Sequence, residues 1–171
     1  MTFFFILFII VVLQRLLEVV YARFNERRMK AQGAIEAGQE HYKWIVLLHV
    51  LFFLSLLMEI VYVTEGELAP FWPVALAVFV IAQVLRVWTL YSLGPFWSTK
   101  IIVLPGAKKV KRGPYRWLPH PNYLIVALEI ASLPLIFGGW RTAIVFSIAN
   151  ALLLLLVRIP AEERALQQLK E

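Results

Sequence analysis

One polar, proline-rich stretch decides how the sequence is interpreted: Gly113-Pro114-Tyr115-Arg116-Trp117-Leu118-Pro119-His120-Pro121-Asn122-Tyr123. It places polar and ring-bearing side chains between segments that are otherwise suited only to lipid. A second polar cluster, Arg158-Ile159-Pro160-Ala161-Glu162-Glu163-Arg164, begins where the last apolar segment ends. The two clusters can therefore meet at one face of a membrane, and together they indicate a membrane enzyme.

The surrounding sequence is far too apolar for an ordinary soluble domain. Of its 171 residues 61% are hydrophobic, and the mean hydropathy is +0.75, so we expect a single all-α membrane domain over residues 1–171. A helix needs about 20 mostly apolar residues to cross the hydrocarbon core. Five segments qualify, with a short amphipathic helix after the last: 3–22, 45–63, 71–93, 123–139 and 142–159. The fourth contains Glu129 and Pro134, so we expect it to be kinked or only partly inserted.

The start of the chain and its lack of cysteine narrow the options further. No basic region precedes the first apolar segment and no small-residue cleavage pattern follows it, so we expect that segment to be retained rather than removed as a signal peptide. The sequence has no cysteine, which excludes disulfides, thiolate metal sites and a cysteine nucleophile. We expect no metal site.

Positive charge is concentrated on one side of the predicted spans. The connection at 23–44 holds five Lys and Arg residues, the connection at 94–122 holds six and the tail from Arg158 holds three, whereas the connection at 64–70 holds none. The positive-inside rule then places the amino terminus outside and the carboxyl terminus in the cytoplasm of a bacterial cell. Topology and anionic lipid explain the net charge of +6, and no nucleic-acid motif accompanies it.

Ionisable residues inside the predicted spans are candidates for function, because a charge at membrane depth costs at least about 2.5 kcal/mol. They are Arg15, Glu18, His49, Glu59, Arg86 and Glu129. Arg15 and Glu18 lie three apart, which predicts a local ion pair. His49 has no second histidine nearby and is expected to make an internal hydrogen bond, and Glu59 is expected near the outer interface. Glu129 follows the 120–123 run by about two turns, so it either points into the same cavity as a substrate contact or packs against Arg86.

The connection at 94–122 is too long for a simple turn. It contains a short β-like run at 101–104, a Pro105-Gly106 turn and the basic stretch 107–112. One interpretation is an amphipathic basic belt on the cytoplasmic leaflet, with tryptophans as anchors. The prolines of the 113–123 stretch favour another, because a stiffened chain holds rings and backbone groups in place around a ligand.

In this order the motifs resemble the isoprenylcysteine carboxyl methyltransferase family of integral membrane enzymes. The shared pattern is Leu-Gly-x-Phe, a Pro-Gly turn, Gly-Pro-Tyr-Arg, His-Pro-x-Tyr, an apolar hairpin and Arg-x-x-x-Glu-Glu-x-x-Leu. In this chain it is carried by Leu93 to Phe96, Pro105-Gly106, Gly113 to Arg116, His120 to Tyr123 and Arg158 to Leu166. The resemblance covers residues 86–168. Two positions depart from it: Pro119 stands where the family commonly has arginine, and Ile125 where it commonly has glycine.

The resemblance implies S-adenosylmethionine as the methyl donor, held between the last helices and the cytoplasmic segment rather than by a Rossmann domain. The fingerprint Gly-x-Gly-x-x-Gly does not occur in the sequence. The implied cofactor contacts are Lys100, Ala107, Lys108, Lys109, Val110, Tyr115, His120, Pro121, Asn122, Tyr123 and Glu162. The implied catalytic residues are Arg158, Glu162 and Glu163, with Arg158 facing the reacting group of the substrate.

The two polar clusters supply the group types that this donor requires. Its adenine, diol, amino-acid head and sulfonium call for rings, hydrogen bonds, charge partners and an electron-rich wall. Arg158 and Glu162 lie four apart and share a helical face, although Pro160 is expected to bend the helix. Methyl transfer is an in-line displacement in which the enzyme mainly aligns the groups. A carboxylate or acidic enol needs no strong base, but a less acidic hydroxyl does; the candidate bases are His120, Glu129 and Glu163.

The favoured substrate is a lipid-soluble enol or phenol, such as the hydroxylated alkylpyrones associated with related bacterial proteins, followed by the carboxyl group of an isoprenylcysteine. Either would be a lipophilic partner reached from the bilayer. Two other classes stay open. One is an NADPH-dependent membrane reductase whose loops bind a dinucleotide, and the other is a non-catalytic scaffold or lipid-binding protein. The sequence leaves the oligomeric state open.

Overall fold

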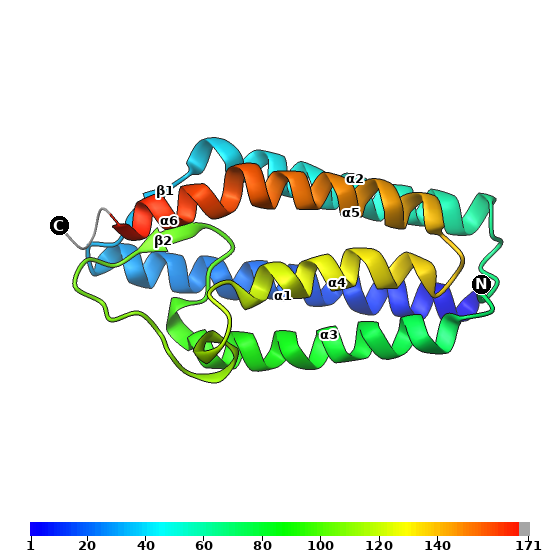
Figure 1. The fold of residues 1–171 in the computed structure, drawn as a ribbon, viewed down its shortest axis with the longest axis horizontal. Helices are drawn as coiled ribbons and strands as arrows, with labels where there is room; N and C mark the ends of the chain where they lie inside the picture. Colours follow the sequence, from blue (N-terminus) through cyan, green and yellow to red (C-terminus); the bar gives the residue numbers. More distant parts are fainter. Residues whose placement is uncertain (168–171) are drawn as a thin grey trace.

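The computed structural model describes residues 1–167 as a bundle of long helices with a small sheet at one end (Figure 1). The long helices are α1 (Thr2–Ala31), α2 (Gln39–Tyr62), α3 (Trp72–Leu93), α4 (Pro121–Leu135) and α5 (Trp140–Leu153). α5 continues through a π-helical segment, η3 (Leu154–Arg158), into α6 (Ile159–Gln167). The predicted all-α membrane fold is confirmed. Residues 168–171, which include the last position of the motif region 86–168, lie outside the described residues.

Among the described residues, four helices are long and apolar enough to cross a membrane. They are α1, α2, α3 with its extension to Phe96, and the continuous helix Trp140–Gln167. α4 is a shorter apolar helix with Pro134 near its end, in line with the expectation for the fourth segment. The bundle exposes large apolar side chains, among them Leu17 and Leu156, each 70% exposed. An apolar outer surface of this kind suits lipid rather than water, so the chain is a multi-pass membrane protein.

The helices extend further at their polar ends than the sequence predicted. α1 continues past residue 22 to Ala31, and α2 begins at Gln39 rather than at residue 45. Much of the basic connection at 23–44 is therefore helical, because a helix can leave the hydrocarbon and continue into water. The disturbance expected at Pro160 takes the form of the π-helical segment η3 just before it, whose wider turn accommodates a residue without a backbone N–H.

A two-stranded antiparallel sheet joins the two basic connections. The β-like run predicted at 101–104 forms β2 (Ile101–Val103). Its partner, β1 (Ile35–Ala37), lies between α1 and α2 and was not predicted. Ile35 stands opposite Val103 and Ala37 opposite Ile101. The sheet therefore fixes the α3–α4 connection to the first half of the chain.

The apolar core fills the end of the bundle that is opposite the sheet (Figure 1). α4 packs against both α3 and α5, and α2 lies along α5. The rings of Phe4 and Phe137 meet edge to face with centroids 5.2 Å apart. The buried cluster draws side chains from α1 to α4 and the turn that follows: Phe4, Val11, Phe52, Leu56, Ile60, Ala75, Phe79, Ile130, Leu133, Ile136 and Phe137. This packing holds the helices in register, so that the polar end of the bundle has a defined geometry.

Glu59, at the end of α2, caps the first turn of α5. Its carboxylate accepts hydrogen bonds from the backbone N–H groups of Arg141, at 3.2 Å, and Thr142, at 2.8 Å. The first N–H groups of a helix have no partner within the helix. A buried carboxylate from a neighbouring helix therefore supplies what the sequence of the turn itself lacks.

We expect Glu59→Ala to lower the free energy of unfolding by about 1–2 kcal/mol, because it removes the acceptor for both N–H groups. The measurement is reversible unfolding of the purified protein in mixed detergent micelles. Glu67→Ala is the matched control, since Glu67 is exposed in the α2–α3 connection, and it should change stability by less than about 0.5 kcal/mol. Equal effects of the two substitutions would contradict the capping role.

Candidate functional site

The α3–α4 connection is folded back onto the end of α1. Asn25 donates from Nδ2 to the carbonyl oxygens of Gly94, at 3.2 Å, and Trp97, at 3.0 Å. Tyr21 donates its hydroxyl proton to the same Gly94 carbonyl at 3.0 Å. Asn25 is buried, so its bond to Trp97 is shielded from water, and the three bonds together hold the beginning of the connection in place.

Gly113 lets the connection approach α3 closely. It begins the short 3-10 turn η2 (Gly113–Arg116) with φ +57°, and a Cβ added there would lie 1.9 Å from Oγ of Ser92. Arg112 donates from Nε to the backbone carbonyl of Ser92 at 2.6 Å. Both the left-handed backbone and the close contact require glycine, so the Gly-Pro-Tyr-Arg motif is a docking point for the loop.

Lys100, a predicted cofactor contact, lies in a cluster of ion pairs at the sheet. Its Nζ is 2.9 Å from Glu26 on α1 and 3.0 Å from Glu36 on β1. Lys30 pairs with the same two carboxylates. Hydrogen bonding to Glu26 raises the pKa of Lys100, which keeps the side chain positively charged. Its contact with a cofactor stays a prediction.

The centre of the site combines the start of α4 with the end of the last helix. The rings of His120 and Tyr123 are stacked, with centroids 5.3 Å apart. Tyr123 donates its hydroxyl proton to the carboxylate of Glu162, and Arg158 donates from Nε to the Tyr123 hydroxyl oxygen at 3.1 Å. Nδ1 of His120 lies 3.6 Å from Oε1 of Glu162. The structure thus brings the two polar clusters of the sequence together.

Arg158 is buried with one donor left over. Its side chain donates from Nη2 to the carbonyl oxygen of Thr99 at 2.9 Å, and Thr99 Oγ1 lies 3.1 Å from the hydroxyl of Tyr42. Within residues 1–167, the buried Nη1 of Arg158 has no hydrogen-bond partner. An unsatisfied buried donor costs about 1–3 kcal/mol. An acceptor oxygen of a ligand would remove that cost, so the geometry suits an anionic or carbonyl group at this position.

The surroundings of His120 and Tyr115 shift the pKa of both side chains. The carboxylate of Glu162, reinforced by the charge of Glu163, raises the pKa of His120, so the imidazole stays protonated to a higher pH than usual. Glu163 Oε1 lies 3.8 Å from His120 Nε2. Burial, followed by the charge of Glu162, raises the pKa of Tyr115. Tyr115 is therefore a neutral hydrogen-bond donor under ordinary conditions.

The remaining predicted cofactor contacts make fewer interactions with the rest of the protein. Ala107, Lys108 and Lys109 are exposed and Val110 is half-buried; no side-chain hydrogen bond or ion pair joins them to the rest of residues 1–167. Pro121 is buried at the start of α4, a position where its missing N–H has no cost. Contacts of these residues with a cofactor stay predictions.

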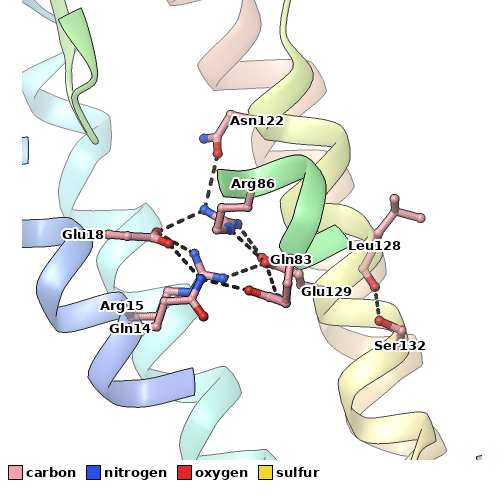
Figure 2. A network of polar contacts seen from close by, with 9 residues as sticks. All are labelled: Gln14, Arg15, Glu18, Gln83, Arg86, Asn122, Leu128, Glu129 and Ser132. Carbon is pink, nitrogen blue, oxygen red and sulfur yellow. Dashed lines mark hydrogen bonds and ion pairs between the residues drawn. The ribbon is translucent and has the colours of Figure 1, made fainter. Parts of the chain in front are cut away.

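Glu129 and Asn122 belong to a second polar network, in the middle of the bundle (Figure 2). Glu129 Oε1 accepts hydrogen bonds from Arg86 Nε at 2.8 Å, from Arg15 Nη2 at 2.7 Å and from Gln83 Nε2 at 2.7 Å. Of the two alternatives left open for Glu129, the structure shows the packing against Arg86. A direct contact between Glu129 and a substrate stays a prediction.

Two other intramembrane expectations are confirmed beside this network. Arg15 Nη1 lies 2.7 Å from Glu18 Oε2, as the three-residue spacing predicted. His49 Nδ1 lies 2.8 Å from the carbonyl oxygen of Ile45, which is the predicted internal hydrogen bond. Arg15, His49 and Glu129 also line a cavity of about 20 Å³ among apolar side chains. This volume has room for about one water molecule.

Sequence reasoning missed several residues that hold the site together. Tyr42, Asn25 and Glu26 precede the motif region, and Thr99 acts through its backbone carbonyl as well as its hydroxyl. No spacing rule links residue 42 to residue 99, and any residue type supplies a carbonyl. No signal in the sequence could have identified these contacts.

The fold defines a multi-pass membrane protein whose candidate site lies at one end of a helix bundle. The family model described as "Isoprenylcysteine carboxyl methyltransferase (ICMT) family" matches residues 75–168. The chain belongs to this family, which makes it a membrane methyltransferase by family.

Two curated relatives match the chain over most of its length, and neither printed name gives a function. The chain is 47% identical to YpbQ, an uncharacterized protein of Bacillus subtilis (strain 168), over 96% of this chain and 97% of the relative. It is 28% identical to an uncharacterized protein of Haemophilus influenzae (strain ATCC 51907 / DSM 11121 / KW20 / Rd), over 85% of this chain and 84% of the relative. No solved structure matches the chain significantly.

We expect the stability contributed by His120 to depend on pH. Because the pKa of His120 is raised in the folded protein, its contribution is complete below the ordinary histidine pKa of about 6.5 and is lost as the pH rises through the raised value. The melting temperature of wild type should therefore exceed that of His120→Gln by more at about pH 6 than at about pH 9. The same comparison in a Glu162→Gln background should show little pH dependence. A difference that is equal at both pH values would contradict this account.

Proposed function

We propose that the chain is an S-adenosylmethionine-dependent O-methyltransferase working at the cytoplasmic face of a bacterial cell membrane, with residues 1–171 acting as one domain. Membership in the family supports methyl transfer. The position of the site at the basic end of the bundle supports a cytoplasmic face, with the amino terminus outside. The observation that carries the proposal is the buried Nη1 of Arg158, which has no hydrogen-bond partner among residues 1–167 and belongs to the side chain that bonds to Tyr123 of the His120–Tyr123 ring pair.

The residues around Glu162 fit the proposed methyl donor. S-adenosylmethionine, when bound, supplies an electrophilic methyl group on a positively charged sulfur. The stacked rings of His120 and Tyr123 offer an aromatic surface for adenine. The carboxylate of Glu162 would hold the polar end of the donor, and Tyr115 would donate a hydrogen bond. The segment 107–110, of which the first three residues are exposed, would cover the donor from the cytoplasmic side.

Arg158 would hold the methyl acceptor. A guanidinium beside an acidic oxygen favours the ionised form of that oxygen, so Nη1 of Arg158 would both orient the acceptor and increase its negative charge. In the transfer, the acceptor oxygen forms a bond to the methyl carbon while the carbon–sulfur bond breaks. For a hydroxyl acceptor, the proton must pass to a base. Glu163 would be this base; its side chain is 58% exposed, so it can pass the proton on to water. Alignment of the groups would supply most of the rate enhancement.

The acceptor is proposed to be lipophilic. The helical turn just before Arg158 exposes Leu155 and Leu156 on the apolar outer surface. A molecule with its tail in the bilayer can therefore bring a polar head to the depth of Arg158. An enol or phenol such as a hydroxylated alkylpyrone fits this description, and the carboxyl group of an isoprenylcysteine is the second choice. Both present an oxygen acid with an anionic form that Arg158 can bind.

We expect S-adenosylhomocysteine to bind the detergent-purified protein saturably, and His120→Ala and Glu162→Ala to abolish the binding. Isothermal titration calorimetry measures this, with NADPH titrated in parallel. Glu67→Ala, in the α2–α3 connection at the opposite end of the bundle, should bind like wild type. Binding of NADPH instead of S-adenosylhomocysteine would favour a reductase, and binding of neither would favour a scaffold.

We expect Arg158→Gln to lower methyl transfer far more than donor binding. Transfer of a labelled methyl group to a hydroxylated alkylpyrone, with farnesylcysteine tested in parallel, should fall by about 100-fold in kcat/KM. The Kd for S-adenosylhomocysteine should stay within about threefold of wild type. Arg158→Lys should recover part of the activity because it restores a cation. Equal loss of transfer and donor binding would assign Arg158 to the donor instead.

A further inference from the structure

Arg86 lies at the centre of the polar network between α1, α3 and α4 (Figure 2). Its guanidinium donates to both oxygens of Glu129, from Nε at 2.8 Å and from Nη2. The third nitrogen, Nη1, lies 3.1 Å from Glu18 Oε2 and 3.4 Å from Asn122 Oδ1. Arg86 is 2% exposed, so nearly all of these contacts are shielded from water.

The network is balanced in charge and joins three helices. It contains the cations Arg15 and Arg86 and the anions Glu18 and Glu129. Replacing such buried ion pairs by apolar residues often leaves a protein equally stable. Packing alone therefore does not require these charges within the spans, and a role in fixing geometry accounts for them better.

Asn122 connects this network with the candidate site. It is the second residue of α4, adjacent to Tyr123 and two positions after His120. A guanidinium has only hydrogen-bond donors, so Asn122 must turn its carbonyl oxygen, and not its amino group, toward Arg86. Figure 2 shows the amide nitrogen pointing away from Arg86. Arg86 therefore selects one of the two orientations of this amide.

We propose that Arg86 is a positioning residue that presents the amide NH2 of Asn122 as a hydrogen-bond donor to the bound methyl donor. Its target is an acceptor atom of the cofactor, such as a ring nitrogen of adenine, a ribose oxygen or the carboxylate. Glu129 and Glu18 hold the guanidinium in place, and Arg15 supports Glu129 from α1. This inference rests on the proposed S-adenosylmethionine-dependent function and adds a residue outside the predicted cofactor contacts.

The test compares the Kd for S-adenosylhomocysteine among full-length variants by calorimetry, with melting temperatures measured on the same samples. Asn122→Asp removes the NH2 donor while keeping an acceptor for Arg86, so affinity should fall about tenfold with little loss of melting temperature. Arg86→Lys should weaken binding by a similar factor, because an ammonium group lacks the planar fork that holds Glu129 and Asn122 together. In the double variant the two losses should not add, since both act through one amide.

Ser132→Ala is the matched control. Ser132 is buried on the same helix, but among residues 1–167 its hydroxyl bonds only to the carbonyl of Leu128, so the Kd of this variant should equal that of wild type. A wild-type Kd in Asn122→Asp, or losses that add in the double variant, would overturn the inference and leave the proposed function standing. Failure of wild type to bind S-adenosylhomocysteine would overturn the proposed function, and the inference with it. If Arg86→Lys does not fold, Asn122→Asp still tests the NH2 donor on which the inference depends, and a wild-type Kd in that variant overturns the inference.

Discussion

The ion pair between Arg86 and Glu129 is the constraint on which the rest of the structure depends. An unpaired charge within the spans costs at least about 2.5 kcal/mol, so α3 and α4 cannot slide past each other without a large penalty. Arg15 binds the same carboxylate at 2.7 Å, so the interaction also fixes α1 relative to α4. Because α4 begins at Pro121, these ion pairs also determine the position of His120 and Tyr123 at the membrane surface.

The candidate site is formed by residues at the beginning of α4 and at the end of the last helix. The hairpin of α4 and α5 runs away from the sheet and returns, with Glu59 capping the turn. This path brings Arg158 and Glu162 back to the residues that begin α4. The bundle thereby places a buried cation, a carboxylate and two rings between the apolar outer surface and the basic loops at the sheet end (Figure 1). Under the proposed function, a lipophilic acceptor and a water-soluble donor would reach this one site from opposite directions.

Part of this arrangement could be predicted, and the reason is local. His120 and Glu162 adjoin the ends of two consecutive apolar segments, so a simple hairpin brings them together. The pairing of Arg15 with Glu18 follows from one helical turn. In contrast, Lys100 with Glu26, and Tyr42 with Thr99, join segments far apart in the chain. Each partner is of a common residue type, and sequence spacing carries no information about such contacts. The strand β1 was missed for the same reason, since three residues acquire their strand character only from the partner.

The sequence by itself determined the membrane-spanning class, the helical spans and the family, because runs of apolar residues and an ordered set of motifs are properties of neighbouring residues. Only the tertiary structure decided what each intramembrane carboxylate does. Glu129 accepts hydrogen bonds from Arg86, Arg15 and Gln83 inside the bundle, whereas Glu162 lies beside His120 at one end of the bundle. Charged groups in a low-dielectric interior bind whichever partners the packing brings within reach. That choice depends on the arrangement of helices and not on their order in the chain.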